Sequence, residues 1–285
     1  MANIKKIIIP FLLFIIVTVI GCNNANKTFN DTNGTEKVSN EDLSDYFSGY
    51  EGCIVLFDKN KNNYEIFNES KSEKQVSPCS TFKIVNSLIG LEINELQDEN
   101  TTFKWDGRKY PIESWNKDQT LKSAVSNSVV WYFQILASKI GESRMGDFVK
   151  KFDYGNKDIS GGLTKFWLQS SLMISPKEQV EFLKKFYNYQ LPVSKNNIDI
   201  VKDVILLSDE NGIRLSGKTG SGESTNNSKS KMGTINGWFV GYVEKDNNVY
   251  IFATNIEADE TGKENADGLK AKEITLKILR DKNLY

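Results

Sequence analysis

The amino-acid sequence predicts an α+β fold: an antiparallel sheet built from both ends of the chain, flanked by helices, with a helical lobe inserted between the two parts of the sheet. Apolar runs rich in β-branched residues, separated by polar turns, occupy residues 47–75 and 211–285, whereas residues 76–210 carry apolar side chains mainly at helical spacing. Strands on both sides of a block of helices favour one sheet assembled from both chain ends. With 285 residues, the chain is long enough to bury the core of such a fold.

The first 21 residues are predicted to be a signal peptide and not part of the fold. Lys5 and Lys6 precede a 15-residue apolar run, which suits the core of a signal peptide and is short for a membrane-spanning helix. The run ends in small residues before Cys22, in a pattern that resembles a bacterial lipobox. We therefore expect Cys22 to be lipidated and to anchor the exported protein on the outer face of the cell membrane. An uncleaved anchor and an ordinary signal peptide are the alternatives, and the sequence leaves open whether part of the protein is shed.

From Cys22 to residue 46, the chain is predicted to be a flexible tether. The segment is rich in Asn, Thr, Ser, Asp and Glu, and its few apolar residues bury too little surface to offset the entropy lost on ordering. The globular part, residues 47–285, is expected outside the cytoplasm, where Cys53 and Cys79 can form a disulfide. Nothing in the sequence fixes the distance between these cysteines, and two small buried thiols are the alternative.

Charge and composition exclude several classes of function. The 36 Lys and Arg residues nearly balance the 37 Asp and Glu residues, which argues against a nucleic-acid-binding protein. The chain has no histidine, so it holds no Ser-His-Asp triad, no Cys-His dyad and no imidazole metal site. Three cysteines without histidine also argue against structural zinc, and no metal is expected. The proton transfers of an enzyme with this composition must run through lysine, tyrosine or carboxyl groups.

Hairpins and a closing helix bound the helical lobe. The strands expected to pair as hairpins are residues 52–57 with residues 64–67, and residues 235–243 with residues 249–254. A further strand is expected from Ile213, and residues 264–279 are predicted to form the last helix because their apolar residues recur at helical spacing.

Ser80 and Lys83 are the first candidate catalytic residues. Pro78 suits the start of a helix, and a helix places residues three apart on one face. A serine hydroxyl is a poor nucleophile until a base takes its proton. In a chain without histidine, a lysine can be that base if burial lowers its pKa from about 10.4. The alternative is an N-cap serine beside a solvated lysine.

Residues 218–222, with the sequence Lys-Thr-Gly-Ser-Gly, form a second candidate element. They follow an apparent strand, and glycine lets a ligand approach the backbone of an edge strand closely. The lysine and threonine side chains can bind a substrate carboxylate. The alternative is a turn between two strands.

Ser128 is the third candidate, in the sequence Ser128-Val129-Val130 on the helix that continues into Trp131. A hydroxyl there can relay a proton to a leaving nitrogen. Ser123 fits the same short pattern, but Ser128 is preferred because the apolar helix follows it directly. The alternative is an ordinary serine within a helix.

The order of these three elements resembles that of the penicillin-recognising serine enzymes. Further motifs narrow the resemblance to class D, or oxacillinase-type, serine β-lactamases, in the lipoprotein form of a Gram-positive-like bacterium. These motifs are Tyr154-Gly155-Asn156, residues 167–175 (Trp-Leu-Gln-Ser-Ser-Leu-Met-Ile-Ser) and residues 237–244 (Gly-Trp-Phe-Val-Gly-Tyr-Val-Glu). The resemblance covers about residues 47–282, and within it Tyr154 and Asn156 are expected to shape the loop that holds Trp167.

The resemblance implies that Lys83 is carboxylated to N6-carboxylysine and is the general base for acylation and deacylation. Carbon dioxide or bicarbonate is needed for this modification, and no other cofactor is implied. Trp167 is expected to stabilise the carbamate through its indole N–H. Ser80 would attack the lactam carbonyl, and the backbone N–H groups of Ser80 and Ser221 would form the oxyanion hole. Ser128 is expected to help protonate the departing lactam nitrogen.

The same resemblance assigns Lys218 to protonation of the nitrogen, together with Ser128. The further substrate-binding residues that it implies are Val130, Thr219, Gly220 and Ser221. The family usually has an arginine near the start of the last helix that binds the substrate carboxylate, but no arginine occurs here before Arg280. We assign this role to Lys270, with Lys272 as the alternative, although lysine lacks the bidentate fork of arginine.

The sequence thus predicts a lipid-anchored enzyme that hydrolyses penicillin-type antibiotics through a serine acyl-enzyme and gives antibiotic resistance. Its expected partners are β-lactam small molecules and, through Cys22, the membrane. The alternatives are a non-hydrolysing β-lactam sensor domain, a penicillin-binding transpeptidase, and a lipoprotein that is an adhesin or a substrate-binding protein. The sequence does not show whether penicillins, cephalosporins or carbapenems are the preferred substrates, and it does not fix the oligomeric state.

Overall fold

The computed structural model describes residues 37–222, 236–258 and 265–285 of the chain. The predicted signal peptide, Cys22 and most of the predicted tether lie outside these residues. Within the described ranges, no helix combines the length and the apolar character needed to cross a membrane.

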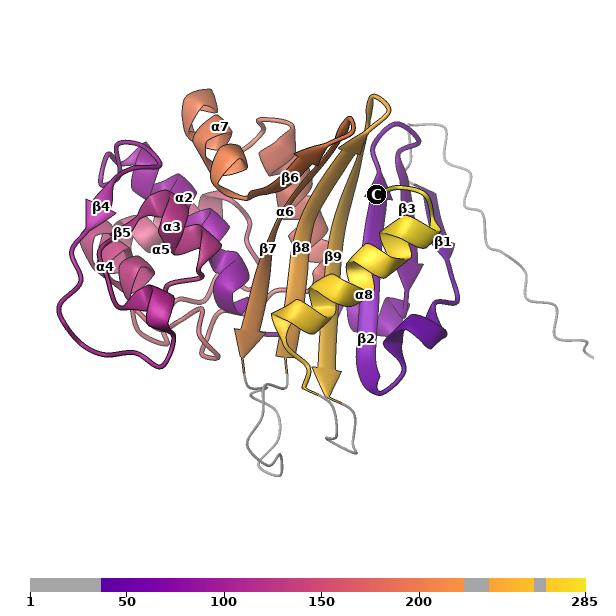
Figure 1. The fold of residues 1–285 in the computed structure, drawn as a ribbon, viewed down its shortest axis with the longest axis horizontal. Helices are drawn as coiled ribbons and strands as arrows, with labels where there is room; N and C mark the ends of the chain where they lie inside the picture. Colours follow the sequence, from indigo (N-terminus) through magenta and orange to yellow (C-terminus); the bar gives the residue numbers. More distant parts are fainter. Residues whose placement is uncertain (1–36, 223–235, 259–264) are drawn as a thin grey trace, which may run out of the picture.

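A seven-stranded sheet with the order β1-β3-β2-β9-β8-β7-β6 forms the centre of the molecule (Figure 1). Its strands are β1 (Lys37–Asn40), β2 (Tyr50–Asp58), β3 (Asn63–Phe67), β6 (Leu206–Glu210), β7 (Ile213–Gly222), β8 (Asn236–Lys245) and β9 (Asn248–Ala258). The central pair, β2 and β9, comes from opposite ends of the chain, which confirms the predicted assembly of the sheet. Both predicted hairpins are also present, as β2–β3 and β8–β9.

Helices occupy most of the chain between the two parts of the sheet, as predicted. The α-helices are α1 (Glu69–Ser72), α2 (Lys83–Glu92), α3 (Leu121–Ser126), α4 (Val130–Ile140), α5 (Glu142–Lys151), α6 (Pro176–Tyr187), α7 (Lys195–Val204) and α8 (Gly268–Asp281). Three 3₁₀ helices, η1 (Ser44–Phe47), η2 (Cys79–Phe82) and η3 (Glu113–Trp115), and a small second sheet of β4 (Thr102–Phe103) and β5 (Gln119–Thr120) complete the described elements.

The last helix begins at Gly268, four residues later than the periodicity predicts. Asp267 sets this start, because its carboxylate accepts a hydrogen bond of 2.8 Å from the Lys270 N–H, which has no partner inside the helix.

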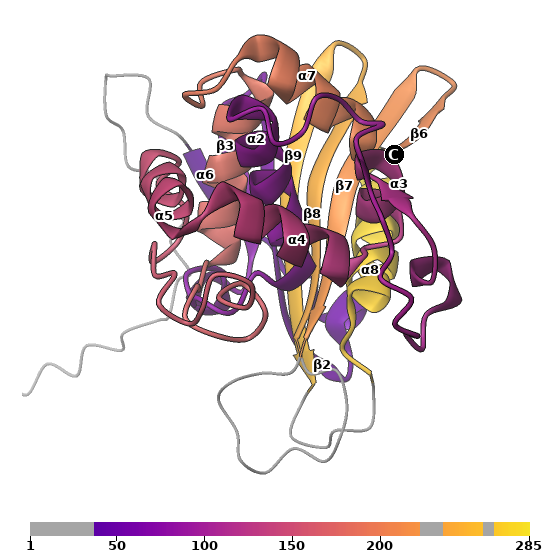
Figure 2. The same ribbon diagram turned by 90° about the vertical axis from the view of Figure 1, so that its left-hand side faces the viewer.

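Alternating side chains of the strands divide the interior into two cores. On β8, Trp238 and Val240 point to the larger core, which the helical lobe shares, whereas Phe239 and Val243 point to the smaller core under α8. Figures 1 and 2 show α8 on one face of the sheet and the helical lobe beside β7 and over the opposite face. A register shift of one residue would exchange the two faces, so burial on both sides fixes the register of the central strands.

Two expectations about the N-terminal part of the sheet need correction. The sheet is mixed, because β1 pairs with β3 in parallel, and β1 comes from the end of the predicted tether. The chain then continues through η1, in which Phe47 is buried. Low hydrophobicity did not keep residues 37–40 from ordering. All four residues are exposed, and the backbone hydrogen bonds that join an edge strand to its neighbour do not require apolar side chains.

Cys53 and Cys79 are free thiols, and both are buried. Of the two possibilities left open by the sequence, the structure therefore has the pair of buried thiols.

We expect Phe47→Ala to lower the free energy of unfolding by about 3 kcal/mol, because it empties a closely packed site. The Phe47 ring stacks on Phe67 with a centroid distance of 4.9 Å and lies over Gly52, where an added Cβ would come within 2.0 Å of the ring. Urea unfolding measures the loss. The control is Val38→Ala on β1, where the side chain is 51% exposed and the change should stay within about 0.5 kcal/mol. Equal, small losses in both variants would show that residues 37–47 do not pack on the sheet.

Candidate active site

A single 3₁₀ turn brings Ser80 and Lys83 together. Pro78 precedes η2, which carries Ser80, and Lys83 is the first residue of α2. Side chains three residues apart nearly eclipse each other in a 3₁₀ helix. The Lys83 Nζ accordingly lies 2.7 Å from the Ser80 Oγ, and both side chains are buried. The predicted shared face is confirmed, but the local helix is 3₁₀, and Ser80 lies within it instead of capping it.

The Lys83 amine lies in apolar surroundings. Its exposed fraction is 0%, and the Phe133 ring centroid is 5.4 Å from Nζ. Burial and, to a smaller degree, the positive charge of Lys218 hold the pKa of Lys83 well below its usual value. A buried ammonium ion without a carboxylate beside it is strongly disfavoured. Burial therefore favours the neutral amine, which can act as a base or a nucleophile.

The segment 218–222 lies within strand β7 and is not a turn. On one edge of β7, strand β6 pairs only as far as Ser216, whereas on the other edge β8 pairs from Arg214 to Gly222. The edge of residues 218–222 that β6 leaves unpaired therefore faces η2. Gly220 permits this close approach, because an added Cβ would lie 3.0 Å from the Pro78 carbonyl oxygen. The glycine therefore sets how closely the strand edge approaches the nucleophile.

Lys218 and Ser128 meet at this edge. The Lys218 Nζ is buried and lies 3.1 Å from the Ser128 Oγ. Burial, together with the positive charge of Lys272, lowers the pKa of Lys218 to about 7. At neutral pH this amine can therefore both give and take a proton.

Ser128 lies in the turn between α3 and α4, and its expected place on the helix is wrong. Its φ of +55° is left-handed, and α4 begins only at Val130. A short turn separates the two helices, and no periodicity in the sequence shows it. The rejected alternative, Ser123, uses its hydroxyl in the capping box of α3, where it accepts from the Thr120 N–H at 3.0 Å. The preference for Ser128 at the site agrees with this geometry.

Trp167 is fully buried beside the nucleophile segment. Its ring stacks on Phe82, the residue before Lys83, with a centroid distance of 5.7 Å. The Trp167 Nε1 is buried and has no hydrogen-bond partner within the described part of the chain, and the same holds for both polar atoms of the Asn86 amide, three residues after Lys83. Unpaired buried polar groups typically cost about 1–3 kcal/mol each, so the site can accept an added polar group.

The motif that includes Tyr154 and Asn156 shapes the loop before and after Trp167. The Asn156 amide donates to the Ser171 carbonyl at 2.8 Å and accepts from the Met173 N–H at 3.0 Å. Gly155 has a φ of +53°, and an added Cβ would lie 2.0 Å from the Met173 carbonyl oxygen. This motif thus ties the two ends of the loop together, which agrees with its expected structural role.

The first turn of α8 lies against β7, and its two candidate lysines differ in their surroundings. The half-buried Lys270 pairs its Nζ with the exposed Glu273 at 3.0 Å. Lys272, on the other side of the helix, is the lysine whose charge lowers the pKa of Lys218. Sequence alone did not show which face of the helix packs on the strand. Here Gly268 sets that face, because an added Cβ would lie 2.6 Å from the Gly220 carbonyl oxygen.

The remaining predicted substrate-binding residues lie on the same elements. Val130 is half-buried at the start of α4, Thr219 and Gly220 follow Lys218 on β7, and the exposed Ser221 accepts from the Gly268 N–H at 2.9 Å. The structure thus gathers the predicted residues from η2, α2, β7 and the turn between α3 and α4. Sequence reasoning missed Ser77, whose hydroxyl and carbonyl bind several parts of the site, although its place three residues before Ser80 was a usable signal.

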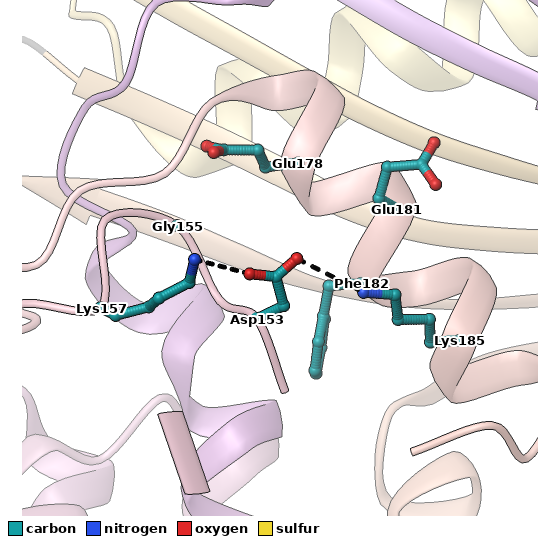
Figure 3. Close-up of a pocket in the computed structure, with 7 residues that line it drawn as sticks. All are labelled: Asp153, Gly155, Lys157, Glu178, Glu181, Phe182 and Lys185. Carbon is teal, nitrogen blue, oxygen red and sulfur yellow. Dashed lines mark ion pairs between the residues drawn. The ribbon is translucent and has the colours of Figure 1, made fainter. Parts of the chain in front are cut away.

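A pocket of about 360 Å³ lies elsewhere, between the 153–157 loop and α6 (Figure 3). It is lined by Asp153, Gly155, Lys157, Glu178, Glu181, Phe182 and Lys185. Asp153 lies between Lys157 and Lys185, at 2.6 and 3.7 Å, so the charges on its wall largely pair with one another (Figure 3). The pocket contains none of the predicted site residues. In the described ranges, no three or more Cys, Asp or Glu side chains gather as a possible metal site.

Comparison with known proteins gives a consistent family. The family described as penicillin binding protein transpeptidase domain matches residues 52–280. The probable β-lactamase YbxI of Bacillus subtilis is 41% identical over 243 residues, which cover 85% of each chain. The solved structure of the class D β-lactamase BAT-2 superposes with a TM-score of 0.78 at 40% identity, covering 86% of this chain and 97% of that one.

The regulatory protein BlaR1 of Bacillus licheniformis is also similar, with 41% identity over 250 residues. The match covers 87% of this chain but only 40% of BlaR1, so the chain spans about two fifths of the length of that relative.

We expect Lys218→Met to stabilise the protein more in acid than in alkali. In the folded protein the pKa of Lys218 is about 7, against about 10.4 in an unfolded chain. The folding penalty of this amine is therefore complete below about pH 7 and disappears as the pH rises through about 10.4. Urea unfolding at about pH 6 and pH 10 should show a gain larger by a few kcal/mol at the lower pH. The exposed Lys122→Met is the control, and a gain independent of pH would contradict the buried amine.

Proposed function

The chain belongs to the class D β-lactamases, and from this premise we propose that it hydrolyses the β-lactam amide of penicillin-type antibiotics through an acyl-enzyme on Ser80. One observation carries the proposal: the fully buried Lys83 amine lies 2.7 Å from the Ser80 Oγ. A base at this distance can take the hydroxyl proton directly.

We propose that Lys83 works in its carboxylated form. A neutral amine attacks carbon dioxide, forms an N–C bond and releases a proton, which leaves an anionic N6-carboxylysine. The apolar surroundings of Lys83 favour the neutral amine that this reaction needs. The unpaired Nε1–H of Trp167 supports the same proposal, since it is a buried donor that a carboxylate oxygen would satisfy. Carbon dioxide or bicarbonate is the only small molecule that the modification requires.

In acylation, Lys83 takes the Ser80 proton while Oγ bonds to the lactam carbonyl carbon. The backbone N–H groups of Ser80 and Ser221 stabilise the negative charge that develops on the carbonyl oxygen. When the C–N bond breaks, the nitrogen takes a proton through the Ser128 hydroxyl, which Lys218 supplies. The distance of 3.1 Å between Lys218 and Ser128, and a pKa of Lys218 of about 7, support this transfer near neutral pH.

Before deacylation, the proton that Lys83 took from Ser80 passes through solvent to Lys218, which has given one to the nitrogen. In deacylation, Lys83 is again an unprotonated base and takes a proton from water, and the hydroxide formed attacks the ester carbon of the acyl-enzyme. The ester C–O bond breaks, Ser80 Oγ regains a proton, and the ring-opened product leaves as a carboxylate. One base thus serves both halves of the reaction.

The substrate is proposed to lie along the free edge of β7, between Thr219, Gly220 and Ser221 on one side and Val130 on the other. Its carboxylate is proposed to bind near Lys218 and Lys272, because the positive charge of Lys272 lowers the pKa of Lys218. This assignment replaces the expected role of Lys270, which pairs with Glu273.

Export and anchoring through a lipidated Cys22 are part of the proposal and rest on the N-terminal sequence alone. An enzyme on the outer face of the cell membrane would meet β-lactams before they reach their targets, and would give antibiotic resistance.

A β-lactam sensor is the second candidate, and the 41% identity to the regulatory protein BlaR1 favours it. A sensor and a hydrolase share the acylation step and differ in the release of the acyl group. Sustained turnover therefore separates the two functions.

We expect purified protein to hydrolyse benzylpenicillin through many turnovers in the presence of bicarbonate. Lys83→Ala should lower kcat at least about 10³-fold, because it removes the base for both steps, and any acylated Ser80 should persist in a mass spectrum. The exposed Lys122→Ala is the matched control and should keep full activity. A single stoichiometric acylation of the wild-type protein would indicate the sensor instead, and rapid turnover by Lys83→Ala would exclude Lys83 as the base.

We also expect Lys272→Ala to raise KM for benzylpenicillin about 10-fold, the effect of losing one charge-assisted contact with a carboxylate. Lys270→Ala removes the same charge from the same helix and should change KM less than about two-fold, since this side chain pairs with Glu273. Steady-state kinetics on both variants measures the difference. A larger effect at Lys270 would restore the assignment made from the sequence.

A further inference from the structure

We propose that Ser77 is a positioning residue whose hydroxyl fixes Trp167 beside Lys83 and thereby sets how readily Lys83 is carboxylated. This inference rests on the proposed function, in which Trp167 donates a hydrogen bond to the carboxylated Lys83.

The Ser77 hydroxyl binds the backbone on both sides of Trp167. It donates to the Trp167 carbonyl at 3.0 Å and accepts from the Gln169 N–H at 2.9 Å. Ser77 is 3% exposed, so water does not readily replace either bond. One hydroxyl therefore fixes the carbonyl of Trp167 and the N–H two residues later.

The backbone of Ser77 is in turn fixed to the sheet. Its carbonyl accepts from the Asn236 amide at 3.0 Å and from the Trp238 indole N–H at 2.9 Å. Asn236 is itself held, because its side-chain oxygen accepts from the Asn255 amide at 2.7 Å. Strands β8 and β9 thus provide a rigid base for the Ser77 hydroxyl.

The loop needs this fixation at Trp167. Gln169 has a left-handed backbone with a φ of +57°, an unfavourable conformation for a residue with a side chain. The next backbone link between the two segments is the bridge between Val76 and Ile174, with N–O distances of 3.0 and 2.9 Å, seven residues after Trp167. Without the hydroxyl, its hydrogen bonds to the Trp167 carbonyl and from the Gln169 N–H are lost, and the loop can shift. A small shift of the indole would weaken a hydrogen bond to the carboxylated lysine, because such bonds depend steeply on distance and angle.

The population of carboxylated Lys83 can be measured directly with ¹³C-labelled bicarbonate and ¹³C NMR. We expect Ser77→Ala to raise the bicarbonate concentration that gives half-carboxylation about 10-fold, and to recover most of its kcat at saturating bicarbonate. A general loss of structure would not be reversed by bicarbonate. The control is Ser72→Ala, at a fully buried serine whose hydroxyl donates to the Glu69 carbonyl at 2.7 Å, and it should carboxylate like the wild type.

A double-mutant cycle tests whether Ser77 acts through Trp167. In a Trp167→Phe background, which lacks the indole donor, Ser77→Ala should change the half-carboxylation concentration less than two-fold. If the two substitutions act independently, Ser77 does not work through Trp167 and the inference is overturned. If Ser77→Ala does not fold, Ser77→Thr and Ser77→Val replace it. Threonine and valine have the same shape and differ in the hydroxyl, so only the Val variant should lose carboxylation.

The experiment distinguishes this inference from the function on which it rests. A wild-type protein without a carbamate signal at any bicarbonate concentration would overturn the proposed base. A wild type that is carboxylated and a Ser77→Ala variant that is carboxylated equally would overturn the role of Ser77 alone.

Discussion

The burial of a lysine amine without a counter-charge is the constraint on which the rest of the site depends. An ammonium ion taken out of water costs far more than one hydrogen bond returns, so burial favours the neutral form of Lys83. The positive charge of Lys218 adds to this effect, because it also disfavours the protonated form of Lys83. The fold therefore supplies the reactive form of the base without histidine, and the chemistry follows from desolvation more than from any single contact.

The sheet makes this desolvation possible because it comes from both ends of the chain. Because β2 and β9 lie at the centre of the sheet, β7 lies near one edge of it. Strand β6 pairs only with the first half of β7, and the helical lobe approaches the other half. The free edge of β7 faces η2, and Gly220 lets the two backbones meet. The approach of η2 to β7 thus produces both the dry interior that Lys83 needs and the open strand edge that a substrate needs.

The sequence predicted the parts of the site that depend on local spacing. Ser80 and Lys83 are three residues apart, and any helical turn brings them together. The hairpins and the block of helices followed from periodicity for the same reason. Local spacing does not predict the places of Ser128 and Lys272. Ser128 lies in a left-handed turn, and Lys272 lies on a helix face that is set by the close approach of Gly268 to Gly220. Both places depend on packing between segments that are distant in the sequence. Strand β1 was missed because exposed edge pairing leaves no hydrophobic pattern.

The distribution of unpaired polar atoms indicates where the described interior lacks a chemical group. Six buried side-chain atoms have no hydrogen bond there. Three of these atoms nevertheless take part in ion pairs. Lys71 Nζ pairs with Glu257 Oε1 at 2.9 Å, and Arg214 Nε pairs with Asp209 at 3.1 Å. The other three belong to Asn86, three residues after Lys83, and to Trp167, stacked on the residue before Lys83. Interiors rarely leave such groups unpaired, and here both residues belong to, or pack on, the segment that carries Lys83. A carboxyl group on the Lys83 amine would add acceptors to this segment.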